Sequence, residues 1–133
     1  MLGEVFKDVP RASFVIATKV KPEGNDEASA KTFLDKFDLS LKRLKLDYVD
    51  ILHVHAVASR DDVLAPAILE AAQTAKKLGK AKHIGVSVHK NEPAVIQAVI
   101  ESGVYEVVLT SINFKQAHYP ELKKAIAAAA KAG

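Results

Sequence analysis

The sequence predicts an α/β fold in which four consecutive strand–helix units form one parallel sheet. Two observations predict it: four short runs rich in β-branched residues, and a helical pattern after each run. Strands that alternate with helices pair in parallel through right-handed crossover connections. Because 133 residues with 49% hydrophobic content are enough for one core, we expect a single domain over residues 1–133.

The predicted strands are short and regularly spaced, and the first three begin at equal intervals along the sequence. Their predicted ranges are 13–20, 48–55, 83–88 and 105–112. After the first strand, apolar residues recur at spacings of three and four, which is the period of one helix face. These residues are Ala30, Phe33, Leu34, Phe37, Leu41 and Leu44. We expect this face to be buried against the sheet.

Capping residues mark the predicted helix ends. Asn25 precedes two acidic residues and is the predicted N-cap of the first helix. A proline near the first turn indicates each later helix start. These prolines are Pro66, Pro93 and Pro120. Glycines, which favour helix C-caps, fall at the expected ends of the last three helices. They are Gly79, Gly103 and Gly133.

Composition excludes several classes of function. The chain has no cysteine, which excludes disulfides, thiolate metal sites and iron–sulfur ligation. Its formal net charge is only +3 and its lysines are scattered, so we expect a solvated basic face and no nucleic-acid partner. No apolar run approaches the roughly 18 residues that span a membrane, and the charged N-terminus is unlike a signal peptide. We therefore expect no membrane partner and a cytoplasmic location.

One segment carries a recognisable combination of motifs. Ser40–Leu44 reads SLKRL and is followed by Asp47–Asp50, DYVD, at the entry of a strand that ends at His55. ATKV at residues 17–20 and LGKAKHIGVS at residues 78–87 flank it. Together these motifs resemble the aldo/keto reductase family over nearly the whole chain.

The resemblance implies a half (β/α)8 barrel of the TIM type. Residues 13–133 would correspond to the third to sixth strand–helix units, and residues 1–12 to a remnant of the preceding helix. A complete barrel of this type usually needs about 250 residues. Segments 87–89, 103–108 and 113–116 are most similar to the branch of the family that often carries a ferredoxin-like region.

The resemblance also assigns roles to individual residues. Lys19 and His55 match two of the four catalytic positions of the family. An ammonium can lower the pKa of an acidic tyrosine, and a histidine can orient the carbonyl that is reduced. Without the family match, Lys19 would be interpreted as a snorkelling strand-end lysine and His55 as a core histidine. The family's tyrosine and aspartate precede the matched units, and Tyr48 and Asp50 are interpreted as structural.

The family binds NADP(H), and the resemblance places two contacts to the nicotinamide in this chain. Ser87 matches a serine that holds the carboxamide, and Asn113 lies at the end of the last strand on the same rim. Val88 and Leu109 replace the asparagine and glutamine of the family. His53 shares a strand face with His55, but without a paired carboxylate or third histidine we expect no metal site.

Two functional interpretations remain. The family activity is NADP(H)-dependent reduction of a small carbonyl substrate, but the catalytic set here is incomplete, and we expect the half barrel to be inactive alone. The alternative is an active oxidoreductase completed by another chain that carries the missing half. Four strands of an open barrel also leave two free edges and an apolar inner face, which favour a homodimer.

Overall fold

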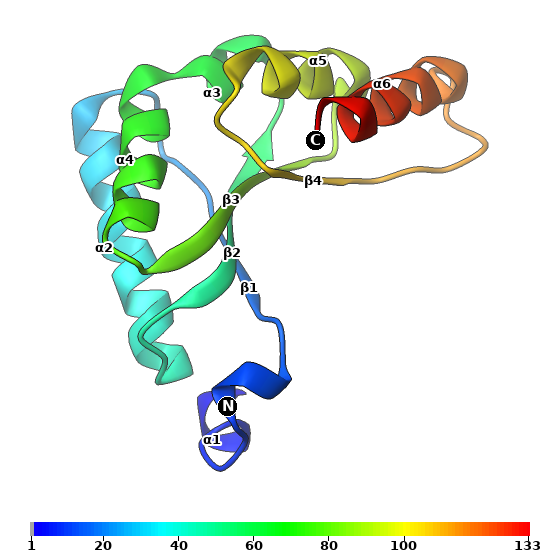
Figure 1. Cartoon of the computed structure of the whole chain (residues 1–133). Helices are drawn as coiled ribbons and strands as arrows, with labels where there is room; N and C mark the ends of the chain where they lie inside the picture. Colours follow the sequence, from blue (N-terminus) through cyan, green and yellow to red (C-terminus); the bar gives the residue numbers. More distant parts are fainter. Residues whose placement is uncertain (1) are drawn as a thin grey trace.

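The computed structural model describes residues 2–133 and contains one four-stranded sheet (Figure 1). All strand pairs are parallel, and the order across the sheet follows the chain, β1-β2-β3-β4. The strands are β1 (Ala17–Val20), β2 (Val49–Val57), β3 (Ala81–Val88) and β4 (Val107–Thr110). The predicted fold class of four strand–helix units is therefore confirmed.

A long helix follows each strand, and shorter helices lie at the N-terminus and after β2. The long helices are α2 (Glu27–Leu44), α4 (Pro66–Lys77), α5 (Glu92–Ser102) and α6 (Tyr119–Ala132). The short ones are α1 (Leu2–Val5), a 3₁₀ turn (Arg11–Ser13) and α3 (Arg60–Leu64). The sequence analysis missed α3, which is too short for a periodic pattern but begins with a capping box between Ser59 and Asp62.

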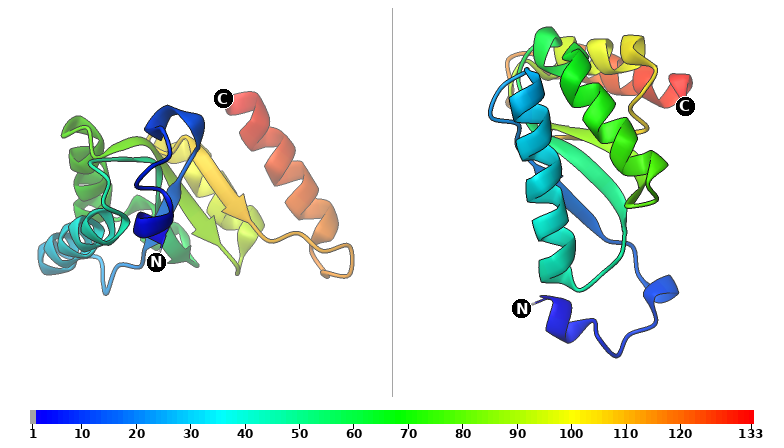
Figure 2. Two further views of the ribbon diagram at one scale, coloured as in Figure 1. Left: turned by 90° about the horizontal axis from the view of Figure 1, so that it is seen from below. Right: turned by 90° about the vertical axis from the view of Figure 1, so that its left-hand side faces the viewer.

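One face of the sheet is covered by helices. Figure 2 shows α2 and α4 side by side on this face. Strand residues that point toward the helices have almost no exposed surface. They include Leu52, Val54, Ile84, Val86 and Val88. The apolar stripe of α2 packs here too: Phe33, Phe37 and Leu41 are buried, and the other three predicted residues are partly buried.

The opposite face of the sheet is free of helices and is more polar than predicted. Alternate residues point to this face because side chains alternate along a strand. Lys19, His83 and Leu109 are exposed there, and Ile51 and His55 are half-buried. We predicted an apolar inner face, but a lysine and histidines interrupt it, so the described surface is mixed.

The start of α2 differs from the prediction by one residue. The N-cap is Asp26, not Asn25, because the Asp26 carboxylate accepts a hydrogen bond from the Ser29 N–H. The helix ends at Lys45, which adopts the left-handed conformation with φ 57° although it is not glycine. At later helices Pro66, Pro93 and Pro120 lie in the first turn, as predicted.

The first strand is shorter than predicted because Arg11–Ser13 form a 3₁₀ turn. Side chains at the amino-terminal ends of the strands hold this region. Asp50 accepts hydrogen bonds from Arg11 at 2.6 Å and from the Ile16 N–H at 2.9 Å. Lys82 adds an ion pair at 3.0 Å. Burial raises the pKa of Asp50, but these hydrogen bonds outweigh it and hold the pKa well below its usual value.

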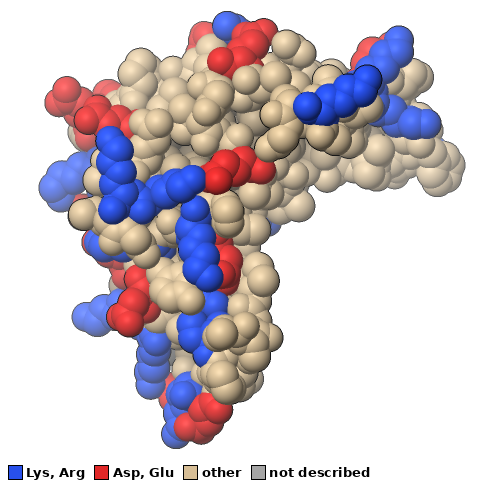
Figure 3. Space-filling model, viewed as in Figure 1, with Lys and Arg blue, Asp and Glu red and all other residues tan. Residues whose placement is uncertain are grey.

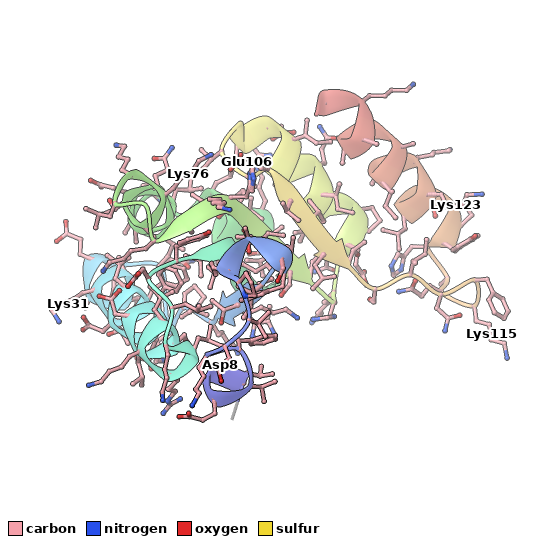
Figure 4. All side chains as sticks on the ribbon, turned by 60° about the horizontal axis from the view of Figure 1, so that its bottom comes forward. Asp8, Lys31, Lys76, Glu106, Lys115 and Lys123 are labelled. Atoms are coloured by element: carbon pink, nitrogen blue, oxygen red, sulfur yellow. The ribbon has the colours of Figure 1, made fainter. Side chains whose placement is uncertain are left out.

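A second acidic centre lies at the same amino-terminal rim. Glu106 accepts hydrogen bonds from Lys76 at 2.7 Å and from the Ile84 N–H, and its carboxylate lies 2.9 Å from His83. Figure 4 shows Lys76 on α4 close to Glu106. Burial raises the Glu106 pKa, but these contacts lower it to about 2. The basic groups of this rim are therefore matched by acids.

The last helix is the least embedded. In α6 only Leu122 is buried, while Ile126 and Ala129 remain half-buried and line a groove between α6, α5 and β4. The groove encloses about 510 Å³. In Figure 2 α6 stands apart from β4. No helix among residues 2–133 is long and apolar enough to cross a membrane.

Candidate functional site at the carboxyl ends of the strands

Lys19 and His55 lie on the open face of adjacent strands, toward their carboxyl ends. Lys19 is the register partner of His53, and His55 is the partner of Ser87. Because His55 follows His53 by two residues, all three side chains point to the same face. The fold thus brings together the two residues that were predicted as catalytic.

His53 lies between them and is held rigidly. Its Nδ1–H donates to the Val86 carbonyl at 3.2 Å, and its ring covers Gly85. A Cβ on Gly85 would lie only 2.6 Å from Nδ1 of His53. Burial lowers the pKa of His53, and the nearby Lys19 and His55 lower it further. His53 is therefore a neutral packing residue at neutral pH.

A β-bulge follows His55. The register of β2 and β3 shifts between His55 and Val57, and Ala56 has a positive φ of 59°. The Ala56 N–H donates to the Ser87 hydroxyl oxygen at 3.3 Å. Bulges reorient side chains and occur often beside active sites. No sequence pattern predicts this bulge, because an alanine occupies the position where glycine is expected.

Two further basic residues surround His55. The rings of His55 and His89 meet edge to face, with centroids 6.4 Å apart. Burial lowers the pKa of His55, and then Lys19, His89 and Lys21 lower it by electrostatic repulsion. The sequence analysis missed His89 and Lys21. The signal was available, because each residue directly follows the end of a strand on this rim.

The two predicted cofactor residues differ in their accessibility to a ligand. Ser87 has no exposed surface and its hydroxyl oxygen accepts the Ala56 N–H. Asn113 lies beyond the end of β4 in an exposed loop, where its Oδ1 accepts the Lys115 N–H at 2.9 Å. The side-chain amide nitrogen of Asn113, Nδ2, remains available to a ligand. These two side chains offer few contacts to a nicotinamide in the described structure.

Side-chain hydrogen bonds tie the loops of this rim to one another. Asn91 donates to the Ala58 carbonyl at 2.9 Å and links the loops after β3 and β2. The buried Glu92 carboxylate lies 2.9 Å from His118 and accepts from Ser111 at 3.2 Å. It links the start of α5 to the loop between β4 and α6.

Tyr48 and Asp50 lie at the opposite, amino-terminal rim. Arg11 and Lys82 lie over the Tyr48 ring, with their cationic groups 4.1 and 4.7 Å from its centroid. Asp50 binds the same two cations. Among residues 2–133, no group of three or more histidine or acidic side chains gathers in a geometry that holds a metal ion.

Comparison with known proteins identifies the family. Residues 1–131 match the sequence pattern of the aldo/keto reductase family. The chain belongs to this family. It is 42% identical over 93 residues to L-galactose dehydrogenase of Arabidopsis thaliana, a match that covers 65% of this chain and 28% of that enzyme. It is 28% identical over 125 residues to methylglyoxal reductase DkgB of Escherichia coli O157:H7, covering 94% of this chain and 45% of that enzyme.

Solved structures of aldo/keto reductases share the fold. An aldo/keto reductase from Brucella melitensis matches with a TM-score of 0.65 and 30% identity over 83% of this chain and 42% of its own. A thermostable aldo-keto reductase in complex with the inhibitor epalrestat matches with a TM-score of 0.74 and 24% identity, covering 99% and 46%. The chain thus spans less than half the length of these four proteins.

Proposed function

We propose that this chain forms half of the barrel of an NADP(H)-dependent carbonyl reductase and contributes Lys19 and His55 to its active site. The observation that carries the proposal is their placement on one open face, at the carboxyl ends of adjacent parallel strands. Barrel enzymes place their chemistry at this end of the strands. The relatives named as a dehydrogenase and a reductase support the same reaction class.

The two side chains suit a carbonyl reduction. When hydride adds to a carbonyl carbon, negative charge develops on the oxygen and must be stabilised and protonated. A neutral His55 can donate a hydrogen bond to this oxygen, and its lowered pKa keeps it neutral. The Lys19 ammonium adds positive charge on the same face. A proton donor still has to be supplied, because Tyr48 lies at the other rim.

We propose that the 133-residue chain alone neither binds NADP(H) tightly nor reduces carbonyls. Ser87 is fully buried, and only the side-chain amide nitrogen of Asn113, Nδ2, is free to contact a nicotinamide. Val88 and Leu109 offer no amide where the family has two. A second candidate is activity after completion by another chain with the remaining strand–helix units, which the coverage of about half of each solved structure favours.

We further propose that two copies of the chain pair through the free edges of their sheets. β1 and β4 are the two outer strands, and each has four residues. The apolar groove beside β4 can receive a strand, and β1 of a second copy offers one. In a two-fold dimer both contacts form at once, and four plus four strands make the eight of a closed barrel.

Fluorescence titration of the chain with NADPH tests the cofactor proposal. We expect no saturable binding up to a concentration of roughly 100 µM, which is about a hundred times the lower end of the usual range of KM values. Saturable micromolar binding would refute the proposal of a silent half barrel. Carbonyl reduction that is lost in Lys19→Ala and His55→Ala would then establish an active enzyme.

Light scattering tests the dimer. We expect a mass of two chains, and we expect Ile126→Asp to give a monomer because Ile126 lines the groove. Ala127→Asp is the matched control, since Ala127 is the next residue of α6 but is exposed and outside the groove. A monomeric parent chain, or equal dissociation in both variants, would refute this interface.

A further inference from the structure

The basic side chains at the two rims of the sheet differ in whether they contact acidic side chains. At the amino-terminal rim each basic residue contacts a carboxylate: Arg11 and Lys82 bind Asp50, and His83 binds Glu106. At the carboxyl-terminal rim, within residues 2–133, Lys19, Lys21, His55 and His89 form no ion pair with an acid of the chain. The described surface therefore has a cluster of basic side chains, two ammonium groups and two imidazoles, without acidic partners at this rim.

Four acids near this rim in the sequence are committed to other contacts. Glu23 forms an ion pair with Lys36 at 2.6 Å, and Asp26 caps α2. Asp62 accepts from the N–H groups of its own capping box, and the buried Glu92 lies against His118. None of these four contacts involves the basic cluster. The charge of the cluster is therefore free to attract an external anion.

The cluster brings two imidazoles and two ammonium groups to one rim of the sheet. His55 is half-buried and held by its strand, and the His89 ring stands edge-on to it with centroids 6.4 Å apart. Lys19 precedes the end of β1, and Lys21 follows it. Lys19 and Lys21 are exposed, and the loop carrying His89 is tied to the preceding loop by Asn91. Imidazole N–H groups beside ammonium groups suit a planar carboxylate, whose two oxygens accept from different donors.

We infer that this rim binds the carboxylate of a small organic anion, with His89 and Lys21 as its specificity-determining residues. For the reduction this selects substrates in which a carboxylate lies next to the carbonyl, such as 2-oxo acids. The carbonyl oxygen would then lie at His55 and the carboxylate at His89 and Lys21. This last step rests on the proposed reductase function, whereas binding of the anion does not.

The test is an NMR titration of the 133-residue chain that follows the ring C–H signals of its histidines. Pyruvate is the probe, and methyl pyruvate is the matched neutral compound. We expect saturable shifts of the His55 and His89 signals with pyruvate, and at least a fivefold weaker response with methyl pyruvate. The His83 signal, at the other rim, should stay unchanged.

Matched variants localise the binding. His89→Gln and Lys21→Met should weaken pyruvate binding at least fivefold. His83→Gln and Lys77→Met remove the same groups elsewhere on the described surface and should leave it unchanged. Equal responses to pyruvate and methyl pyruvate, or equal effects of test and control variants, would overturn the inference. Inorganic phosphate binding in place of pyruvate would overturn the assignment to a carboxylate.

The result of the anion-binding test can be distinguished from the result of the test of the proposed function. Pyruvate binding that depends on His89 in a chain without reductase activity supports the anion site and leaves the reductase proposal to its own test. Reduction of 2-oxo acids that is unchanged in His89→Gln and Lys21→Met would support the reductase and overturn the anion site.

Discussion

Replacing Gly85 by alanine tests the packing beneath the candidate site. An added Cβ would lie 2.6 Å from the His53 Nδ1 and 2.7 Å from the Val107 carbonyl oxygen, where ordinary contacts begin at 3.4 Å. The ring and the β4 backbone would therefore have to move by about 0.7 Å or more. Overpacking of this kind costs about 1–3 kcal/mol. Loss of the bond from His53 to the Val86 carbonyl adds about 1 kcal/mol.

The expected net effect is a loss of about 1–3 kcal/mol in the free energy of unfolding, because alanine also restricts the unfolded chain by about 0.4–1 kcal/mol relative to glycine. Urea unfolding followed by circular dichroism measures it. Gly24→Ala is the control, since its Cβ would meet no backbone atom and only the Ser29 side chain, whose hydroxyl oxygen lies at 2.9 Å.

A His53→Ala background separates the two contacts. Without the ring, Gly85→Ala should cost less, because only the contact with the Val107 carbonyl remains. An unchanged stability of Gly85→Ala, or an identical cost in both backgrounds, would show that the ring does not pack on Gly85 as described.

Three further changes test other parts of the fold. Asp50→Asn should destabilise the chain by about 1.5–3 kcal/mol in urea unfolding, because it weakens charged hydrogen bonds to a buried carboxylate; exposed Asp35→Asn should change stability by less than about 1 kcal/mol. Lys45→Gly should raise Tm and add about 1 kcal/mol to the free energy of unfolding, because glycine adopts a positive φ without strain. An unchanged Tm would contradict this. Burial lowers the pKa of His53 below 6.5, so the unfolded chain binds more protons near that pH than the folded chain does. The free energy of unfolding should therefore fall as the pH is lowered from about 7.5 to 5.5. His53→Gln should flatten this dependence in unfolding curves measured across that range.

Regular patterns in the sequence predicted most of the fold. Period-three and period-four spacing located α2, and β-branched runs located all four strands, because both patterns follow from which face is buried. Ends were less accurate: Asp26 caps α2 in place of Asn25, since both residue types favour this position and only geometry selects between them. Arg11 contacts Asp50 across 39 residues of sequence, and no local pattern reveals such a distant contact at the start of β1.

The candidate site was only partly predictable. Lys19 and His55 followed from the family motifs, and the structure places them on one face. His89 lies in the quoted segment 87–89 and Lys21 follows a matched strand, but neither motif assigns them a role, and their relevance depends on where the loops carry them. Ser87 and Asn113 stay predictions as cofactor contacts, and so does the assignment to a branch of the family. Burial of the Ser87 hydroxyl depends on the bulge at Ala56, which an alanine does not signal.

Figure 3 shows acidic and basic side chains interspersed along the face over α4, and further lysines on α6. On this face the two signs of charge are mixed, as expected for a solvated surface rather than a nucleic-acid interface. The basic character of the chain is therefore spread over its helices, and the carboxyl-end rim differs from them in lacking acidic partners among the described contacts.

The order of the strands affects how the molecule unfolds and how it can evolve. Each strand pairs only with its neighbours along the chain, so the sheet behaves as a linear array of units. An outer unit can open while the inner pair β2 and β3 stays intact. Backbone amides of α6 and β4 should therefore exchange with solvent through partial openings, ahead of those in β2 and β3. A gene with this order can gain or lose a terminal unit without rebuilding the pairing of the rest.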